Sequence, residues 1–344
     1  MFIRLQDAML AKNYFAFGVL LCLFITISSC NKRATDSDND TQDLKINFSR
    51  FEKDLFSKEN GTPQILRKKH GSFADLILKK VIGLRGENDS LLALEITQYR
   101  DDKYISEVYH QAEQEFKITT DIENGLQNAF SNYHELFPGK IIPEVKTFIA
   151  PFNYNTIATD SVLGIGLDMY LGSGYKYYPT AGFPLFKIRR LSKEYIVSDA
   201  VAAWLQSDYP TGQDDNNLLK NIIHDGKIWY ALDRLLPDES DTIKFGFSKD
   251  QWEWCEKNEL NIWQFFIQNK LLYNANTGEY IKFINDGATT SGFPKDAPSK
   301  LGTFIGLKIV QSFMQKNSGV TLQQLMNRND ADKILIDSGY KPEK

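Results

Sequence analysis

Residues 162–205 read VLGIGLDMYLGSGYKYYPTAGFPLFKIRRLSKEYIVSDAVAAWL, and this stretch decides how the chain folds. It begins with a short β-branched segment and continues through a loop rich in glycine and tyrosine. It ends in a helical pattern in which Ile196, Ala200 and Trp204 fall on one apolar face. The order of strand, loop and helix predicts a small sheet that leads directly into a packed helix.

The loop in this stretch carries four tyrosines, Tyr170, Tyr175, Tyr177 and Tyr178. Each tyrosine combines an apolar ring with a polar hydroxyl. One interpretation is a binding surface whose exposed rings stack on a glycan or another partner. The other is a long loop that is pinned to the body by its own aromatic side chains, and we favour the second.

The rest of the chain predicts an α+β fold that is mainly α-helical. Residues 145–149, 155–158 and 162–167 are short β-branched runs separated by Pro, Asn and Asp, which indicates a small antiparallel sheet within residues 143–168. Helical patterns flank it on both sides. Three of the helices are expected to start with capping boxes, in which two side chains satisfy free backbone N–H groups. The pairs are Thr120 with Glu123, Ser248 with Gln251, and Thr321 with Gln324.

Three glycines inside predicted helices indicate close helix packing. Gly226 interrupts the helix predicted over residues 218–236, where a glycine costs about 1 kcal/mol relative to alanine. Gly302 and Gly306 lie four residues apart in the helix predicted over residues 301–313. In a membrane this spacing is typical of helix dimers, but in water it favours close packing against a neighbouring helix.

The amino terminus reads as a lipoprotein signal peptide, residues 1–29. Its apolar run, 14–27, is shorter than the roughly 20 residues that span a bilayer. The run ends in Ile27-Ser-Ser-Cys30, which resembles the bacterial lipobox, so we expect cleavage before Cys30 and lipidation of its thiol. Residues 30–43 then form a lipidated, flexible acidic tether. Residues 44–344 are expected to form a single globular domain that faces the periplasm, on either the inner or the outer membrane.

Composition and missing motifs exclude several classes of function. The net charge of −4, without a basic cluster, argues against binding nucleic acid. The glycine-rich motifs that bind nucleotides are absent, as is the GxSxG motif of serine hydrolases. We expect no cofactor and no metal, because the histidines lack the spacing of a helical zinc site. Cys255 is expected to be a buried, reduced thiol. The four histidines are His70, His110, His134 and His224.

One pattern weakly resembles a zinc peptidase, in which a sheet precedes a HExxH helix and a later helix supplies a third ligand. At the corresponding places stand Ser198 and Ala202, which are not zinc ligands, with Asp199 and Asp225 as the carboxylates. Three interpretations follow: two ordinary packed helices, a degenerate, zincin-like peptidase scaffold, or an active metal site. We favour the packed helices. If the chain were active, Asp199 and Asp225 would be the candidate catalytic residues.

Several segments together resemble the gliding-motility lipoprotein GldB family. They are GLDMYLGSGYKYYP (166–179), YIVSDA (195–200), Gly226-Lys227, LDRLLP (232–237), WCEKNE (254–259) with Trp263, Arg50-Phe51 and GTFIG (302–306). The resemblance covers nearly all of the chain after Cys30. It implies a lipoprotein in the cell envelope of Bacteroidetes-type bacteria, with partners in the gliding and secretion machinery and without an established enzymatic activity. It also implies a distant relation to predicted HExxH peptidases.

These observations favour a non-enzymatic envelope lipoprotein that binds or stabilises other proteins of the machinery. Two alternatives stay open. One is an envelope hydrolase that acts on protein or peptidoglycan through Asp199 and Asp225. The other is a glycan-binding module that uses the four tyrosines of the 170–178 loop.

Overall fold

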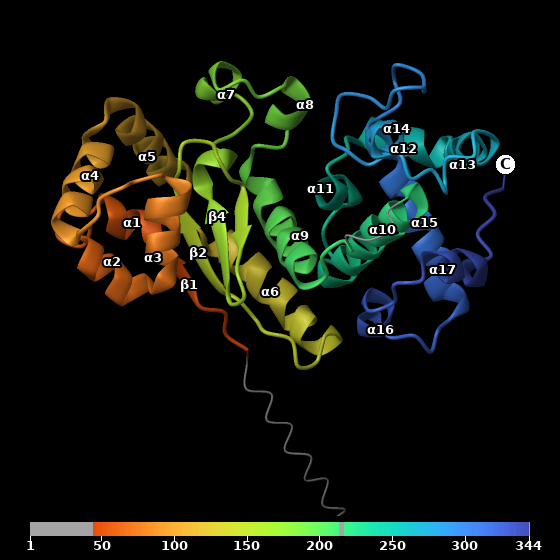
Figure 1. The fold of residues 1–344 in the computed structure, drawn as a ribbon, viewed down its shortest axis with the longest axis horizontal. Helices are drawn as coiled ribbons and strands as arrows, with labels where there is room; N and C mark the ends of the chain where they lie inside the picture. The colour runs from red at the N-terminus through yellow and green to blue at the C-terminus, as the bar shows by residue number, and fades with distance from the viewer. Residues whose placement is uncertain (1–43, 213–216, 344) are drawn as a thin grey trace, which may run out of the picture. The chain divides into compact units, whose positions relative to one another are not determined.

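The computed structural model describes residues 44–212 and 217–343. The predicted signal peptide, Cys30 and the tether lie outside the described residues. Everything described falls within one compact unit, residues 43–344. The prediction of a mainly helical α+β fold is confirmed: many helices surround one small sheet (Figure 1).

The sheet has four strands in the order β1-β2-β4-β3. Strands β1, β2 and β4 are parallel, and only β3 runs antiparallel, against β4. The expectation of an antiparallel sheet was therefore wrong: the sheet is mixed. Its first strand comes from the amino-terminal segment, and parallel neighbours need a long crossover, which the intervening helices supply. The strands are β1 (Phe48–Arg50), β2 (Glu144–Phe148), β3 (Thr156–Ala158) and β4 (Val162–Gly166).

The two faces of the sheet pack against different hydrophobic cores, and β4 shows how the sequence separates them. Its bulky residues Leu163 and Ile165 belong to the larger core. Its glycines face the smaller core, where a Cβ on Gly164 would lie 3.0 Å from the ring of Phe73. Because side chains alternate along the strand, the sequence VLGIG places bulky side chains on one face of β4. On the other face, where the glycines lie, aromatic rings pack directly against the backbone.

The smaller core lies under the amino-terminal helices, which cover one face of the sheet (Figure 1). These are α1 (Phe51–Phe56), α2 (Pro63–His70), α3 (Ser72–Asp75), the π-helix η1 (Leu76–Val81) and α4 (Asp89–Asp101). Helix α5 (Lys103–Glu115) follows α4 and contributes Val108 and Ala112 to the larger core.

The larger core lies between the other face of the sheet and the remaining helices. These are α6 (Thr120–Leu136), η2 (Leu167–Tyr170), α7 (Tyr177–Thr180), α8 (Leu185–Ile188), η3 (Lys193–Tyr195), α9 (Ile196–Asp208), α10 (Leu218–Leu235), α11 (Asp241–Phe245), α12 (Lys249–Lys257), α13 (Glu259–Gln268), α14 (Thr277–Tyr280), η4 (Ile281–Phe283), α15 (Leu301–Lys316), α16 (Leu322–Met326) and α17 (Ala331–Ser338).

Helices α10 and α15 pack closely at the glycines that the sequence singled out. A Cβ on Gly306 would lie 1.7 Å from the carbonyl oxygen of Ile222, and one on Gly226 would lie 2.3 Å from the carbonyl carbon of Gly306. No side chain fits in those positions, so the backbones approach directly. The prediction of close helix packing is confirmed.

Two of the three predicted capping boxes are confirmed, at Ser248 with α12 and at Thr321 with α16. At α6 the predicted capping box is absent, because the N-cap is Thr119 and its side chain caps no backbone N–H group. The helix is preceded by Thr119, whose hydroxyl bonds to the carboxylate of Glu123 at 2.6 Å, while Thr120 is its first helical residue.

Within residues 44–212 and 217–343, none of the helices combines the length and the hydropathy needed to cross a bilayer.

Candidate functional site

The loop after η2 forms a protrusion, residues 171–191, that contains α7 and α8. Figure 1 shows both short helices standing out from the body, past the end of the sheet where β4 finishes. The two ends of the protrusion are tied together, because Gly172 N donates to the carbonyl of Leu191 at 2.9 Å. Compact loops with adjacent ends and internal packing are frequently functional.

The tyrosines of the 170–178 loop hold the protrusion in place instead of forming an exposed platform. Tyr170, Tyr175 and Tyr178 are buried, and Tyr177 is half-buried. The Tyr178 hydroxyl donates to the carbonyl of Asp168 at 2.9 Å and accepts from Leu171 N at 2.8 Å.

The hydroxyl of Tyr177 donates to the carboxylate of Glu107 on α5 at 2.5 Å. The rings of Tyr175 and Tyr178 contact Phe152 edge to face. The interpretation of a self-pinned loop therefore agrees with the structure. The glycan platform does not, since stacking requires exposed ring faces.

The outer end of the protrusion is uncharged. Residues 179–186 read PTAGFPLF, and Pro179, Ala181, Pro184 and Leu185 are exposed. Leu185 has the most exposed side chain among the large hydrophobic residues of the described chain, at 83%. A contiguous apolar surface on a fixed element is a typical feature of protein interaction sites.

A charged network holds the base of the protrusion. Arg190 Nη2 donates to Asp199 Oδ1 at 2.8 Å, and the Tyr170 hydroxyl donates to Asp199 Oδ2 at 3.0 Å. Burial raises the pKa of Asp199, although Arg190 and the hydroxyl of Tyr170 oppose that effect. Arg190 can approach because Gly246 has a positive φ of 73° and lacks a side chain; a Cβ there would lie 2.4 Å from Arg190 Cζ.

Lys300 extends this network toward α10. Burial and the neighbouring Arg190 lower the pKa of Lys300, while Asp286, Asp199 and Asp225 oppose the change. Asp199 and Asp225, the two carboxylates that the sequence singled out, therefore both favour the charged form of the Lys300 ammonium. The carboxylate of Asp225 also accepts from the Thr303 hydroxyl at 3.1 Å. Beside them lies a cavity of about 140 Å³, lined by Gln206, Asp225, Ile228, Trp229, Ile284, Lys300 and Thr303.

Both candidate carboxylates make structural contacts. Each oxygen of Asp199 accepts one hydrogen bond, and the carboxylate forms an ion pair with Arg190. Ser198 is buried, and its hydroxyl donates to the carbonyl of Tyr195 at 3.2 Å. Among residues 44–212 and 217–343, no group of three His, Cys, Asp or Glu side chains is placed to hold a metal ion. Asp199 and Asp225 thus lie on two packed helices, α9 and α10. The zincin-like relation stays a prediction.

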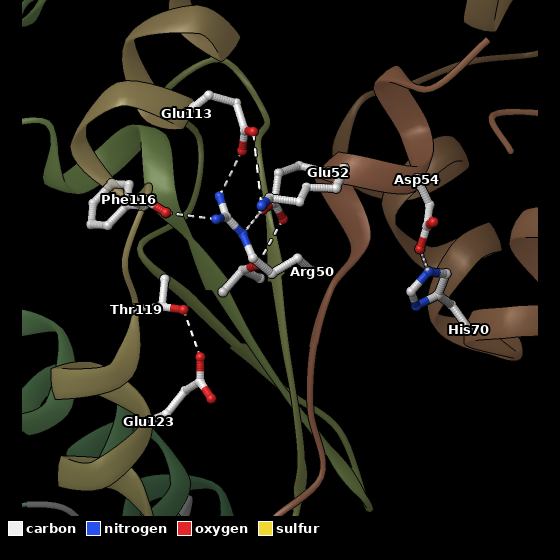
Figure 2. Close-up of polar contacts among 10 residues, drawn as sticks. Arg50, Glu52, Asp54, His70, Glu113, Phe116, Thr119 and Glu123 are labelled. Atoms are coloured by element: carbon white, nitrogen blue, oxygen red, sulfur yellow. Dashed lines mark hydrogen bonds and ion pairs between the residues drawn. The ribbon is translucent and has the colours of Figure 1, made fainter. Parts of the chain in front are cut away.

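A second charged network lies at the end of β1 (Figure 2). Arg50 donates from Nε to Glu52 at 2.5 Å, from Nη1 to the carbonyl of Phe116 at 2.6 Å and from Nη2 to Glu113 at 2.8 Å. The other oxygen of Glu52 accepts from the Thr147 hydroxyl at 2.7 Å. Each of the three nitrogens of this guanidinium donates a hydrogen bond to the protein, so the network is structural.

Near it, His70 on α2 is paired with Asp54 on α1 at 2.8 Å, also drawn in Figure 2. Lys69 bonds to the other oxygen of Asp54 at 2.7 Å. Burial lowers the pKa of His70. By contrast, His110 and His134 are exposed. Cys255 is fully buried and free, in agreement with the expected buried, reduced thiol.

Sequence reasoning missed Arg190 and Lys300. Arg190 is adjacent to Arg189, and the sequence does not distinguish the arginine that pairs with Asp199 from the one that lies exposed. Lys300 has a φ of 59°, a conformation that non-glycine residues seldom adopt. It lies within a segment that reads only as a loop. The arginine pair next to an aromatic loop was the one available signal.

Comparison with known families returned one match. A family described as gliding motility protein GldB matches residues 32–342, which is nearly the whole chain after the predicted signal peptide. Searches of curated proteins and of solved structures gave no match.

Proposed function

This chain belongs to the family of the gliding motility protein GldB, and from that premise we propose that it is a non-enzymatic lipoprotein of the cell envelope. In this proposal its folded body binds and stabilises other proteins of the gliding and secretion machinery through the protrusion at residues 171–191. The observation that carries the proposal is the uncharged, exposed tip around Leu185 on a base fixed by hydrogen bonds and ring contacts.

The proposed anchor is a lipid on Cys30, with the body held in the periplasm by the tether, residues 30–43. The Ile27-Ser-Ser-Cys30 sequence at the end of the apolar run supports this assignment. Several acyl chains anchor stably, since each buried methylene contributes about 0.8 kcal/mol. In a Cys30→Ala variant the protein should leave the membrane fraction after cell lysis. Retention in the membrane would remove the lipid anchor from the proposal.

The topology of the sheet favours a protein partner at the tip over the anchoring membrane. The chain enters β1 at its amino end, whereas the protrusion follows the carboxyl end of β4, and these strands run in the same direction. The point where the tether would join the body and the protrusion therefore lie at opposite ends of the sheet (Figure 1). A tip at the opposite end of the sheet from residue 44 is suited to contact an envelope protein that carries an apolar recess.

The experiment compares two exposed apolar residues. Leu185→Glu places a charge on the tip, and Ile336→Glu places the same charge on α17, where the side chain is 75% exposed. Both variants are produced as full-length lipoprotein in the native host, with membrane amounts measured by immunoblot. We expect Leu185→Glu to abolish gliding and Ile336→Glu to preserve it, because a buried charge at an interface centre costs at least about 2 kcal/mol.

A photo-crosslinking residue at position 184 supplies the second readout. It should give a discrete adduct with an envelope protein, and the Leu185→Glu substitution should remove that adduct. Normal gliding together with an unchanged adduct in Leu185→Glu would overturn the assignment of the tip as the binding surface.

A further inference from the structure

A separate pocket lies on the far side of α10 from the charged base of the protrusion, beside the α16–α17 connection. Its volume is about 310 Å³, at the lower end of the roughly 300–1,000 Å³ that is typical of small-molecule sites. The pocket is lined by Pro210, Thr211, Gly212, Lys220, Ile223, His224, Lys227, Arg328, Asn329 and Ala331. None of these side chains is a carboxylate, while three carry a basic nitrogen that is permanently or readily charged and a fourth is a histidine.

Lys227 is the central group of the pocket. Its side chain is 95% buried, and Nζ donates to the carbonyls of Met326 at 3.0 Å and Arg328 at 2.7 Å. An ammonium has three N–H groups, so one is left over within the described part of the chain. Neither Lys227 nor Arg328 forms an ion pair with a carboxylate among residues 44–212 and 217–343. A buried cation paired only with carbonyls is costly unless an anion joins it.

Arg328 supplies the second cation. Its guanidinium lies 5.3 Å from the ring centre of Phe313, which fixes one face and leaves the planar edge with its N–H groups for a ligand. Arginine binds phosphate oxygens in a bidentate manner. The carboxylate of Asp330, two residues along the chain, accepts from Lys333 N at 2.9 Å and caps α17, so it is already engaged. Lys220 already has an interaction of its own and is not counted as a group that binds the ligand.

We propose that this pocket binds a phosphate monoester, held by the ammonium of Lys227 and the guanidinium of Arg328. Two cations without a counter-carboxylate among residues 44–212 and 217–343 match a dianion better than a monoanion, and a phosphate monoester carries about −1.5 to −2 charges at pH 7. The Asn329 amide can donate to a further oxygen. The volume exceeds that of a phosphate group alone, so the ligand carries a small organic part, from either a soluble ester or a lipid headgroup.

The test is calorimetric titration of the full-length protein in detergent. The probes are inorganic phosphate, glycerol 3-phosphate, a short-chain phosphatidic acid, and glycerol as the neutral control. Saturable binding of glycerol 3-phosphate but not of glycerol is expected. Tighter binding of the phosphatidic acid would identify a lipid source, and equal or weaker binding would identify a soluble ester.

Three variants assign the site. Arg328→Gln should weaken binding of glycerol 3-phosphate about tenfold, whereas Arg328→Lys should retain part of it. The matched control Arg85→Gln removes an exposed arginine on the other side of the molecule and should leave binding unchanged. Circular dichroism confirms that each variant is folded. Absence of saturable binding by all phosphate probes, or equal binding by Arg328→Gln and the parent protein, would overturn the proposal.

Discussion

The Arg50 network and the Arg190 network both hold a guanidinium against a buried or partly buried carboxylate, yet they use their hydrogen-bonding groups differently. Arg50 donates from Nε and from both terminal nitrogens, and its partner Glu52 is fully buried. Arg190 bonds to Asp199 through Nη2, while its buried Nε has no partner in the described structure. We call the Arg50 network complete because all three guanidinium nitrogens have a partner, and the Arg190 network incomplete because Nε has none.

The difference separates a structural element from a surface prepared for contact. The Arg50 network joins α1 to the sheet and to α5. All three nitrogens of its guanidinium are bonded within the protein, so we interpret it as structural. At the base of the protrusion, the buried Nε of Arg190 has no hydrogen-bond partner in the described structure. The protrusion therefore combines a fixed aromatic interior with a less constrained base. This combination is useful where a partner must be accommodated.

Breaking the complete network should have the largest effect. Arg50→Met removes the only cation bonded to Glu52 within the described residues and leaves a fully buried carboxylate with the Thr147 hydroxyl as its side-chain partner. We expect the free energy of unfolding to fall by about 3–5 kcal/mol, measured by urea denaturation of the purified protein. Glu113→Gln is the control, because that side chain is 30% exposed and its pair with Arg50 should contribute under about 1 kcal/mol. Similar losses in the two variants would contradict the view that Glu52 is the centre of the network.

The incomplete network should be less costly to break. Arg190→Met leaves Asp199 with the hydroxyl of Tyr170, and both charged side chains are about one-fifth exposed. A loss of about 2 kcal/mol is expected from removing a charge-assisted hydrogen bond. Limited proteolysis should also cut faster within residues 179–186.

Arg189→Met is the matched control for this variant. Its guanidinium is exposed and bonds to Gln251 at 3.1 Å rather than to Asp199. It should change neither stability nor proteolysis appreciably. If the loss in Arg190→Met reached that of Arg50→Met, the contrast between the networks would disappear.

Local signals were enough to predict the features that depend on a few neighbouring residues. The caps at Ser248 and Thr321 follow from pairs three residues apart. The α10–α15 contact follows from Gly226 and Gly306, because a glycine inside a helix has few purposes other than close approach. The aromatic loop was also interpretable, since four tyrosines in a short segment pack well on themselves.

The long-range features could not be predicted from the same signals. The direction of the sheet depends on Phe48 pairing with Val145, and nothing in either segment specifies a partner so distant in sequence. The base of the protrusion depends on the approach of Gly246 to Arg190, between elements far apart in the chain. Asp199 was recognised as a candidate, but its role as an ion-pair partner follows only from the fold.

A third buried carboxylate extends the comparison, because no cation among residues 44–212 and 217–343 is bonded to it. Asp168 is fully buried and accepts from Phe152 N at 2.7 Å and Ala150 N at 3.2 Å. Burial raises its pKa to about 7, although the two N–H groups oppose the rise. In the unfolded chain the pKa is about 3.9. Between these values the folded state binds more protons, so the contribution of Asp168 to stability is complete below about pH 4 and is lost as the pH rises to about 7.

The measurement is the difference in unfolding free energy between the parent protein and Asp168→Asn at several pH values from 5 to 8. Taking the difference removes groups that both proteins share, including His70, whose lowered pKa acts in the opposite direction. The amide cannot ionise, so the difference should shift in favour of the variant by at most about 1.4 kcal/mol per pH unit up to pH 7 and then level off. A difference that stays constant across this range would mean that the two backbone N–H groups hold Asp168 ionised throughout. A carboxylate without a cation would then be as well compensated as Glu52 beside Arg50.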